Sequence, residues 1–274
     1  MRKTLLLLLF IACKEITFPN ELKPLYISAQ LVVGDTVQYI FVDMPRKPEE
    51  PRGKGFNDAY VEVSDGETTY VFTPELTPIN VIGEFQGGSG KDTIWLYKAK
   101  FSPEPLKTYY LTVIRGKDTA RAQTTTPDTF SFVLIKINPD STFTFISDTV
   151  RLPGDSSVLA IWKKVKGAYL YFAFVYNYDK RDSLLDYEPN RYLFIPVIDS
   201  ALIGGISDSL RGFPPFAFYK DPTFDWGNGN YAAKVWALNR DRYLWGLYGE
   251  GNIDNAEGVF GAVSQYIKVV YVKF

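Results

Sequence analysis

The sequence predicts an all-β protein built from two tandem β-sandwich domains, the first immunoglobulin-like and the second fibronectin-like. Aromatic residues make up 16% of the 274 residues, with 19 Tyr and 20 Phe, and such residues favour strands. The 17 Pro and 21 Gly are distributed between short β-rich runs, where they indicate turns. Turn signals such as Gly34-Asp35, Asp65-Gly66 and Gly116-Lys117 indicate hairpins between these runs. The length suits two domains of modest size.

The first domain is expected over residues 25–128. Segments 44–57 and 74–92 are rich in Pro, Gly or charge, so we interpret them as loops. Alternating or β-rich runs predict strands at 26–33, 36–43, 59–64, 68–73, 93–101, 108–115 and 118–125. Strands this short, joined by hairpin turns, are typical of an immunoglobulin-like sandwich.

The second domain is expected over residues 129–274. Its predicted strands lie at 130–137, 142–146, 157–163, 169–178, 192–198, 230–238 and 264–274. Trp162 on one strand is expected to face aromatic side chains such as Tyr171 on the next, as in the core of a fibronectin-like sandwich. Apolar residues at 243, 244, 247 and 248 have helical spacing, so one short helix is expected near residues 240–249, with Asn239 as its N-cap.

The N-terminal segment Met1–Cys13 contains two basic residues, a short apolar run and the only cysteine of the chain. This order is typical of an export signal, and the run is shorter than the ~20 apolar residues of a membrane span. The tetrapeptide ending at Cys13 resembles a lipobox, where bacterial lipoproteins are acylated on cysteine. We therefore expect a signal peptide over 1–12, a tether over 13–24 and an outer-membrane lipid anchor on Cys13. The alternative is an ordinary signal peptide cleaved elsewhere.

The composition argues against several classes of function. The chain has no histidine, which removes the commonest general base and the commonest metal ligand. Its formal net charge of -1 argues against a nucleic-acid partner, which requires a basic face. We therefore expect no enzymatic activity and no cofactor. A pair of carboxylates acting on a glycan stays open as an alternative.

Aromatic side chains in the segment 213–226 are the most suggestive binding feature. Exposed rings beside carboxylates can stack on sugars or form a hot spot for a protein partner. The interpretation that we favour is that these rings plug one end of a sandwich. The residues concerned are Phe213, Phe216, Tyr219, Phe224 and Trp226.

A calcium site is the second possibility that the loops suggest. Oxygen-bearing side chains are the ligands that Ca²⁺ uses, although the spacing here matches no EF-hand loop. Ordinary turn-forming residues account better for the pattern, and we predict no metal site. The residues concerned are Asp221, Asp225, Asn228, Asn230, Asn252, Asp254 and Asn255.

Several stretches together carry a family resemblance. They are the lipobox with Cys13–Ile16, then Leu31–Gly34, Ala59–Gly66 with Lys107–Val113, and Ala237–Trp245 with Gly251–Ala262. With these stretches the chain resembles uncharacterised outer-membrane lipoproteins of Bacteroidota-type bacteria, a family of unknown function. The resemblance implies a location and a fold rather than an activity. Some such proteins lie beside TonB-dependent transporters, which implies an accessory role in uptake.

The expected function follows from the anchor and the fold. We expect a non-enzymatic binding or accessory subunit of the bacterial cell envelope. Its expected partners are the lipid bilayer, through acylated Cys13, and an outer-membrane transporter or a surface glycan. The alternatives are a structural or adhesive surface protein and, third, a carboxylate-based glycan-active enzyme.

Overall fold

The computed structural model describes residues 23–47, 50, 53–82, 89–137, 142–151, 157–178, 195–198, 211–212, 216–217 and 228–273. Over these residues the chain is all-β with one short helix, as the sequence predicts. The strands are β1 (Tyr26–Val33), β2 (Val37–Asp43), β3 (Tyr60–Ser64), β4 (Thr69–Ile82), β5 (Ser89–Lys100), β6 (Thr108–Arg115), β7 (Asp118–Thr125), β8 (Phe132–Ile137), β9 (Phe143–Ile146), β10 (Thr149–Arg151), β11 (Ser157–Trp162), β12 (Leu170–Asn177), β13 (Ile195–Ile198), β14 (Arg211–Gly212), β15 (Phe216–Ala217), β16 (Gly229–Leu238) and β17 (Glu257–Lys273). The helix is α1 (Arg240–Tyr248).

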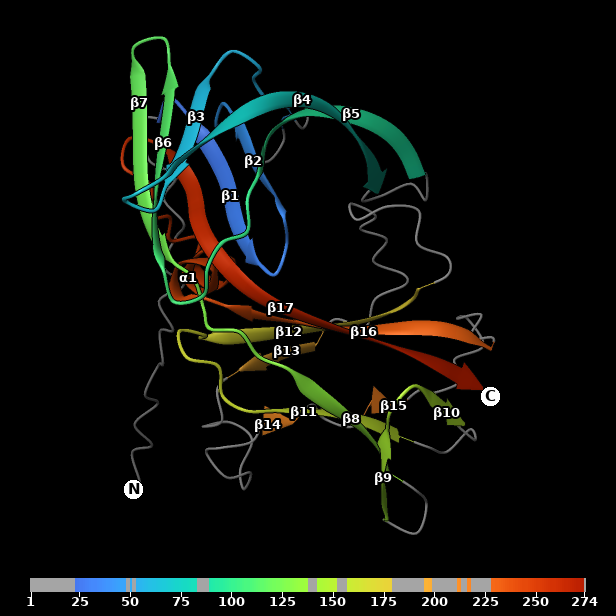
Figure 1. Ribbon diagram of the computed structural model, residues 1–274. Helices are drawn as coiled ribbons and strands as arrows, with labels where there is room; N and C mark the ends of the chain where they lie inside the picture. The colour runs from blue at the N-terminus through green and yellow to red at the C-terminus, as the bar shows by residue number, and fades with distance from the viewer. Residues whose placement is uncertain are drawn as a thin grey trace, which may run out of the picture.

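Two sheets organise the described strands (Figure 1). The larger sheet has the order β13-β12-β16-β17-β1-β2-β5-β4-β3-β6-β7, and β10 joins it beside β17. The smaller sheet has the order β14-β11-β8-β9, and β15 pairs with β11. The large sheet bends so that its two halves belong to two separate hydrophobic cores.

We call the first of these units the N-terminal sandwich; it contains β1–β7 and the first half of β17. Alternate residues of its strands point inward, as the burial pattern of β1 shows. An isolated bridge between Arg121 and Asp254 brings β7 back beside the segment that precedes β17. The buried core includes Ile27, Leu31, Val61, Tyr97, Leu111 and Phe260.

The second unit, the C-terminal sandwich, packs the half-sheet of β12, β16 and the end of β17 against β8, β9 and β11. Trp162 and Tyr171 lie in its core with ring centroids 5.4 Å apart, which confirms the aromatic pairing expected from the sequence. Phe132 packs edge-on against Tyr266 at 5.1 Å. Large aromatic side chains therefore supply much of this core.

Strand β17 belongs to both sandwiches. Its first half pairs in parallel with β1, from Tyr26 with Glu257 to Val33 with Ser264. Its second half pairs antiparallel with β16. The sequence predicted a strand only from residue 264, so the strand begins seven residues earlier than expected. The division of the chain into tandem domains at residue 128 stays a prediction.

The prediction of a loop over residues 74–92 is wrong at both ends. Strand β4 continues through Pro74 and Pro78 to Ile82, and β5 begins at Ser89. The ladder between β3 and β4 ends at Phe72, so beyond it the outer edge of β4 has no partner strand among the described residues. Proline is tolerated on such an edge because no ladder partner there requires its missing N–H.

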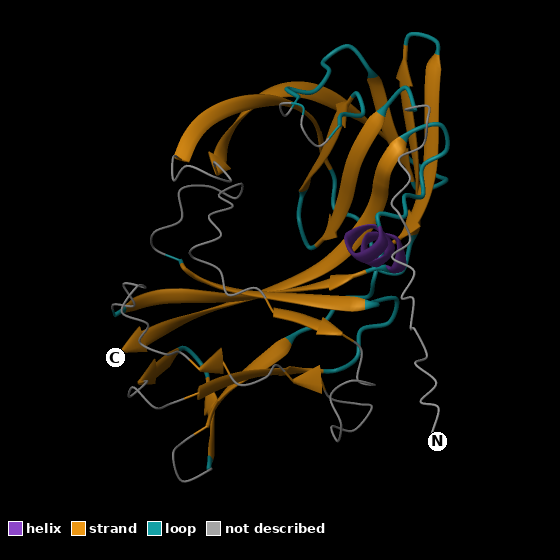
Figure 2. Cartoon of the chain, turned by 180° about the vertical axis from the view of Figure 1, so that it is seen from behind, coloured by secondary structure: helices purple, strands orange, loops and turns teal. Residues whose placement is uncertain are grey.

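Helix α1 confirms the helix predicted near residues 240–249. Asn239 caps it with an extended backbone, and its side chain accepts the N–H of Arg242. The helix ends at Gly249, whose left-handed backbone returns its N–H to the carbonyl of Trp245. Seen from behind, α1 lies at the junction of the two sandwiches (Figure 2). Within the described residues, no helix has the length and apolar character needed to span a bilayer.

Candidate functional site

The site residues proposed from the sequence are mostly beyond the described part of the chain. Cys13 lies outside it, as do Phe213, Tyr219, Phe224 and Trp226. Phe216 begins the short strand β15, but its side chain is not among those described. Acylation of Cys13 and binding by this aromatic segment therefore stay predictions.

Of the possible calcium ligands, Asp221 and Asp225 also lie outside the described residues, Asn228 is exposed, and Asn230 lies within β16. The Asn252 amide bonds both polar backbone groups of Phe260, and the Asn255 amide donates to the Thr119 carbonyl at 3.0 Å. The backbone of Asp254 pairs with Arg121. These last three residues therefore fasten β7 to β17.

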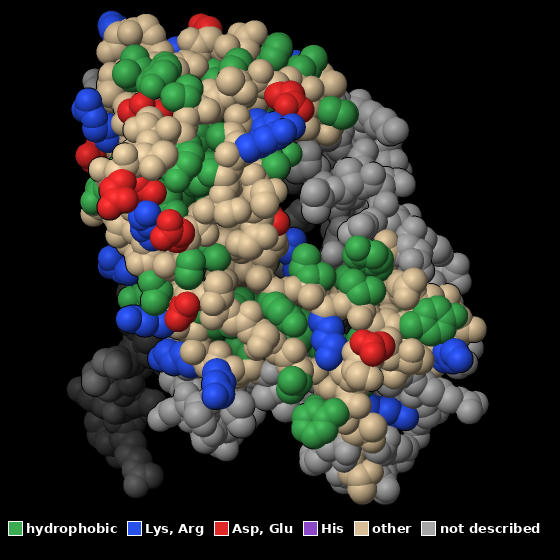
Figure 3. Space-filling view, viewed as in Figure 1, with side chains coloured by type: hydrophobic (Ala, Val, Ile, Leu, Met, Phe, Trp, Pro, Cys, Tyr) green, Lys and Arg blue, Asp and Glu red, His purple; other side chains and the backbone are tan. Residues whose placement is uncertain are grey.

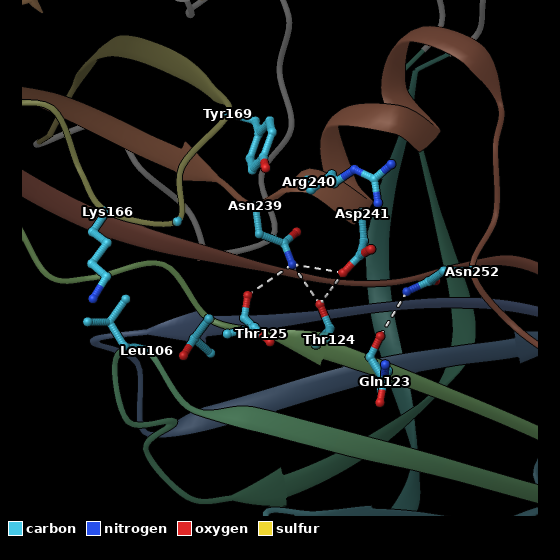
Figure 4. Close-up of a pocket in the computed structure, with 12 residues that line it drawn as sticks. Leu106, Gln123, Thr124, Thr125, Lys166, Tyr169, Asn239, Arg240, Asp241 and Asn252 are labelled. Atoms are coloured by element: carbon cyan, nitrogen blue, oxygen red, sulfur yellow. Dashed lines mark hydrogen bonds between the residues drawn. The ribbon is translucent and has the colours of Figure 1, made fainter. Parts of the chain in front are cut away.

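A cleft of about 640 Å³ opens where the end of β7, the turn before β12 and the start of α1 meet. In the close-up, Lys166 and Leu106 lie on one side, Arg240 and Asp241 lie on the other, and Tyr169 lies above the threonines (Figure 4). The lining residues are Leu106, Gln123, Thr124, Thr125, Thr126, Lys166, Gly167, Tyr169, Asn239, Arg240, Asp241 and Asn252.

Asn239 forms the floor of the cleft. It is only 3% exposed, and all of its side-chain hydrogen-bonding groups are engaged. Its Nδ2 donates to Thr124 Oγ1 at 2.6 Å, to the Thr125 carbonyl at 3.1 Å and to Asp241 Oδ2 at 3.1 Å. Its Oδ1 accepts the N–H groups of Arg242 and Ala262, each at 3.1 Å. A buried amide satisfied in this way fixes β7, α1 and β17 to one another.

Asp241 is the one carboxylate among the lining residues. Its Oδ2 accepts the Thr124 hydroxyl at 2.8 Å as well as the Asn239 amide. It lies in the first turn of α1, where a negative charge interacts favourably with the helix dipole. Asp241 therefore has a structural role in closing the floor.

The polar side chains at the rim of the cleft, by contrast, are not engaged by other described residues. The side chains of Gln123, Lys166 and Arg240 make no hydrogen bond or ion pair with any other described residue. Tyr169 is 49% exposed, and its ring lies 6.3 Å from that of Tyr243. Two cations, an amide and an aromatic face are thus available to a ligand above a rigid floor.

This arrangement suits binding better than catalysis. Acid–base hydrolysis of a glycoside needs two carboxyl groups on either side of the reacting bond, and this lining contains one. The chain has no histidine to replace the second carboxyl. The twelve lining residues offer hydrogen bonds, positive charge and a ring, which are the means of recognition.

A second polar cluster connects the β1–β2 turn with β16 and β17. Gln265 Nε2 donates to Asp35 Oδ1 at 2.6 Å, and Trp236 Nε1 donates to Gln265 Oε1 at 3.3 Å. The Lys234 ammonium lies 4.9 Å from the centroid of the Trp236 ring. Burial lowers the pKa of Lys234 and raises that of Asp35, and the attraction between the two opposes both shifts.

Sequence reasoning identified Asn239 only as a helix cap and Asn252 only as a possible calcium ligand, and it missed the rest of the cleft. The lining comes from segments around residues 106, 123–126, 166–169 and 239–252, and no motif spacing connects them. No family model matches the chain, and the curated proteins contain no match to it. The fold and the cleft thus define an all-β protein with a cleft lined largely by polar residues at the junction of its two sandwiches.

Proposed function

We propose that this protein is a lipid-anchored component of a bacterial cell envelope that acts there as a non-enzymatic binding or accessory subunit. The observation that carries the binding role is the cleft, whose single carboxylate is engaged while its two cations and its ring are free. The anchor rests on the sequence of Met1–Cys13. The partner that we propose is a surface glycan or an outer-membrane transporter that handles one.

The envelope location is supported by the physics of acylation. One acyl chain holds a protein only marginally at a bilayer, whereas two or more hold it durably, at about 0.8 kcal/mol for each buried CH₂. A diacylglyceryl group on Cys13 therefore provides a stable anchor. Figure 3 shows basic, acidic and hydrophobic side chains interspersed over the N-terminal sandwich.

The anchor is tested by expressing the full chain and its Cys13→Ser variant in a Gram-negative host fed a clickable palmitate analogue. We expect the label on the native protein in the outer-membrane fraction, and an unlabelled, released Cys13→Ser protein. A variant that kept its label, or native protein found in the medium with an unmodified Cys13, would overturn the anchor.

The accessory role is tested by purifying the tagged native protein from its own membranes in mild detergent and weighing the products by mass spectrometry. We expect a stoichiometric transporter or bound glycan in the product. Recovery of the protein with neither would count against an accessory subunit. A matched purification of Cys13→Ser separates partners held by the protein from partners that merely share the membrane.

A structural or adhesive role is the second candidate, because one sheet face of the N-terminal sandwich carries exposed apolar side chains. Tyr60 and Ile114 are cross-strand neighbours on β3 and β6, and they are 44% and 38% exposed. Val71 on β4 and Tyr110 on β6 add to the same face. Tyrosine and aliphatic side chains exposed together are typical of contact surfaces.

A further inference from the structure

The ionisable side chains that line the cleft leave it with unpaired positive charge. Lys166, Arg240 and Asp241 are the three charged residues of the lining. Asp241 keeps its negative charge while it accepts hydrogen bonds from the Thr124 hydroxyl and the Asn239 amide, whereas the two cations have no partner among the described residues, so the three side chains carry a net positive charge. An anionic group on a ligand would therefore find charge-assisted donors here.

The start of α1 itself does not offer this site to a phosphate. Its first-turn dipole already faces the carboxylate of Asp241, and the Arg242 N–H is taken by the Asn239 side chain. A phosphate site at a helix N-terminus needs free N–H groups and no competing carboxylate. The anion must therefore be held by side chains on the rim, which suits Arg240 because guanidinium pairs well with a carboxylate or sulfate.

The remaining groups match a sugar ring. The half-exposed face of Tyr169 offers an apolar plane with a polar end, and the ring contact with Tyr243 restricts its movement. Gln123 and Thr125 also belong to the lining; they are the cross-strand partners of Tyr110 and Thr108, and the Thr125 hydroxyl bonds that of Thr108 at 2.9 Å. A volume of about 640 Å³ falls within the ~300–1,000 Å³ of small-molecule sites.

We propose that the cleft binds an acidic saccharide, with anionic groups held by Arg240 on one side and by Lys166 on the other and one sugar ring stacked on Tyr169. This inference rests on the proposed binding function and names its ligand class. The floor is already ordered by the Asn239 hydrogen bonds, so binding requires little rearrangement there. Nine of the twelve lining residues have polar side chains, so a ligand that carries hydrogen-bonding groups suits the cleft better than a purely apolar one.

The test uses the purified full-length protein in detergent on an array of uronate-containing, sulfated and sialylated oligosaccharides, each beside its neutral parent. We expect acidic members to be retained and their neutral parents to bind at least about tenfold more weakly, which is the effect of losing one charge-assisted contact. Retention should weaken as salt rises.

The variants Arg240→Gln and Lys166→Gln remove the cations while keeping an unbranched polar side chain, and Lys117→Gln on the distant β6–β7 turn is the matched control. We expect each cleft variant to weaken retention of the acidic members by about tenfold and the control to leave it unchanged. Tyr169→Ala should weaken acidic and neutral members alike, whereas Tyr169→Phe should retain the stacking. Far-ultraviolet circular dichroism establishes that each variant is folded.

Three results would overturn this inference. Equal retention of acidic and neutral members would show a cleft for neutral glycans, with the proposed binding function intact. If Arg240→Gln and Lys166→Gln retained the acidic saccharides as well as the native protein does, the ligand would bind elsewhere on the protein. If no saccharide were retained, saccharides would be excluded as the ligand class of the cleft. Failure of the palmitate label on Cys13, in contrast, affects only the proposed location.

Discussion

The side-chain amide of Asn252 forms hydrogen bonds with both the backbone N–H and the backbone carbonyl of Phe260. Phe260 N–H donates to Asn252 Oδ1 at 2.9 Å, and Asn252 Nδ2 donates to the Phe260 carbonyl at 2.8 Å. Asn239 bonds Ala262 in a related way, with its backbone N–H on the Ala262 carbonyl at 3.0 Å and its Oδ1 on the Ala262 N–H. Two asparagine side chains thus take the place of a neighbouring strand along β17, directly beneath the cleft.

The Asn239→Ala variant should lower the free energy of unfolding by about 3 kcal/mol, because it removes a helix cap and leaves buried N–H groups without acceptors. Urea unfolding followed by tryptophan fluorescence measures this. Glu250→Ala, at an exposed position just after the helix, is the control and should change stability by no more than about 0.5 kcal/mol. Equal effects of the two variants would show that the Asn239 network contributes little.

Two glycines should respond in opposite directions to alanine. Gly258 has φ +109°, and a Cβ there would collide with the Ile27 carbonyl oxygen, so Gly258→Ala should cost more than about 3 kcal/mol. Gly246 lies in α1 with open space around it, so Gly246→Ala should stabilise the protein by about 0.5–1 kcal/mol. Thermal unfolding of both variants tests the pair, and a tolerated Gly258→Ala would contradict the close pairing of β1 with β17.

The Asp65→Asn variant should reduce stability in a pH-dependent way. Lys107, 2.8 Å away, and the N–H groups of Thr68 and Glu67 hold the pKa of Asp65 well below its ordinary value of 3.8. The unfolded chain therefore binds the proton more readily, so the stabilisation is complete above pH 3.8 and is lost as the pH falls through the lower folded-state pKa.

Urea midpoints of native protein and Asp65→Asn should accordingly differ most at neutral pH and converge in acid. Lys107→Met, which removes the other half of the ion pair, should show the same convergence. A gap that stays constant from neutral pH to acid would mean that the charge of Asp65 does not matter to the fold.

The Lys234→Met variant should show a pH dependence at the alkaline end. Burial lowers the pKa of Lys234 below its ordinary 10.5, so the folded state releases the proton more readily than the unfolded chain. The cost of the desolvated ammonium is present below the folded-state pKa and disappears as the pH rises toward 10.5. The native protein should therefore gain stability relative to Lys234→Met between neutral and alkaline pH, as measured in urea. Parallel stability curves would refute this.

Local signals in the sequence were enough to predict the helix and several of the hairpins. Asn239 before a helically spaced apolar run predicted both α1 and its cap, and the Gly116 turn predicted the β6–β7 hairpin. The first seven residues of β17 were missed, and Gly258 and Gly261 lie in that part. Gly258 is required by the approach of Ile27, and a Cβ on Gly261 would lie 3.0 Å from the Cβ of Arg242 in α1. Such close packing is visible only once distant segments are placed together.

The cleft could not be predicted for the same reason. Thr124 and Asn239 lie 115 residues apart in the chain, and neither belongs to a motif. The sequence drew attention instead to the aromatic residues around Phe213 and Trp226, where composition is unusual. A site assembled from a strand end, a turn and a helix start leaves no periodic trace in the sequence.

The double membership of β17 sets the order of folding events during synthesis. Strand β1 is among the first segments to be made, yet its neighbour Glu257–Ser264 is among the last, so the N-terminal sandwich cannot close until nearly all of the chain has emerged. Contacts this remote in sequence make folding slow. Until β17 arrives, the apolar faces of the early strands stay exposed, and chaperones must keep them from aggregating.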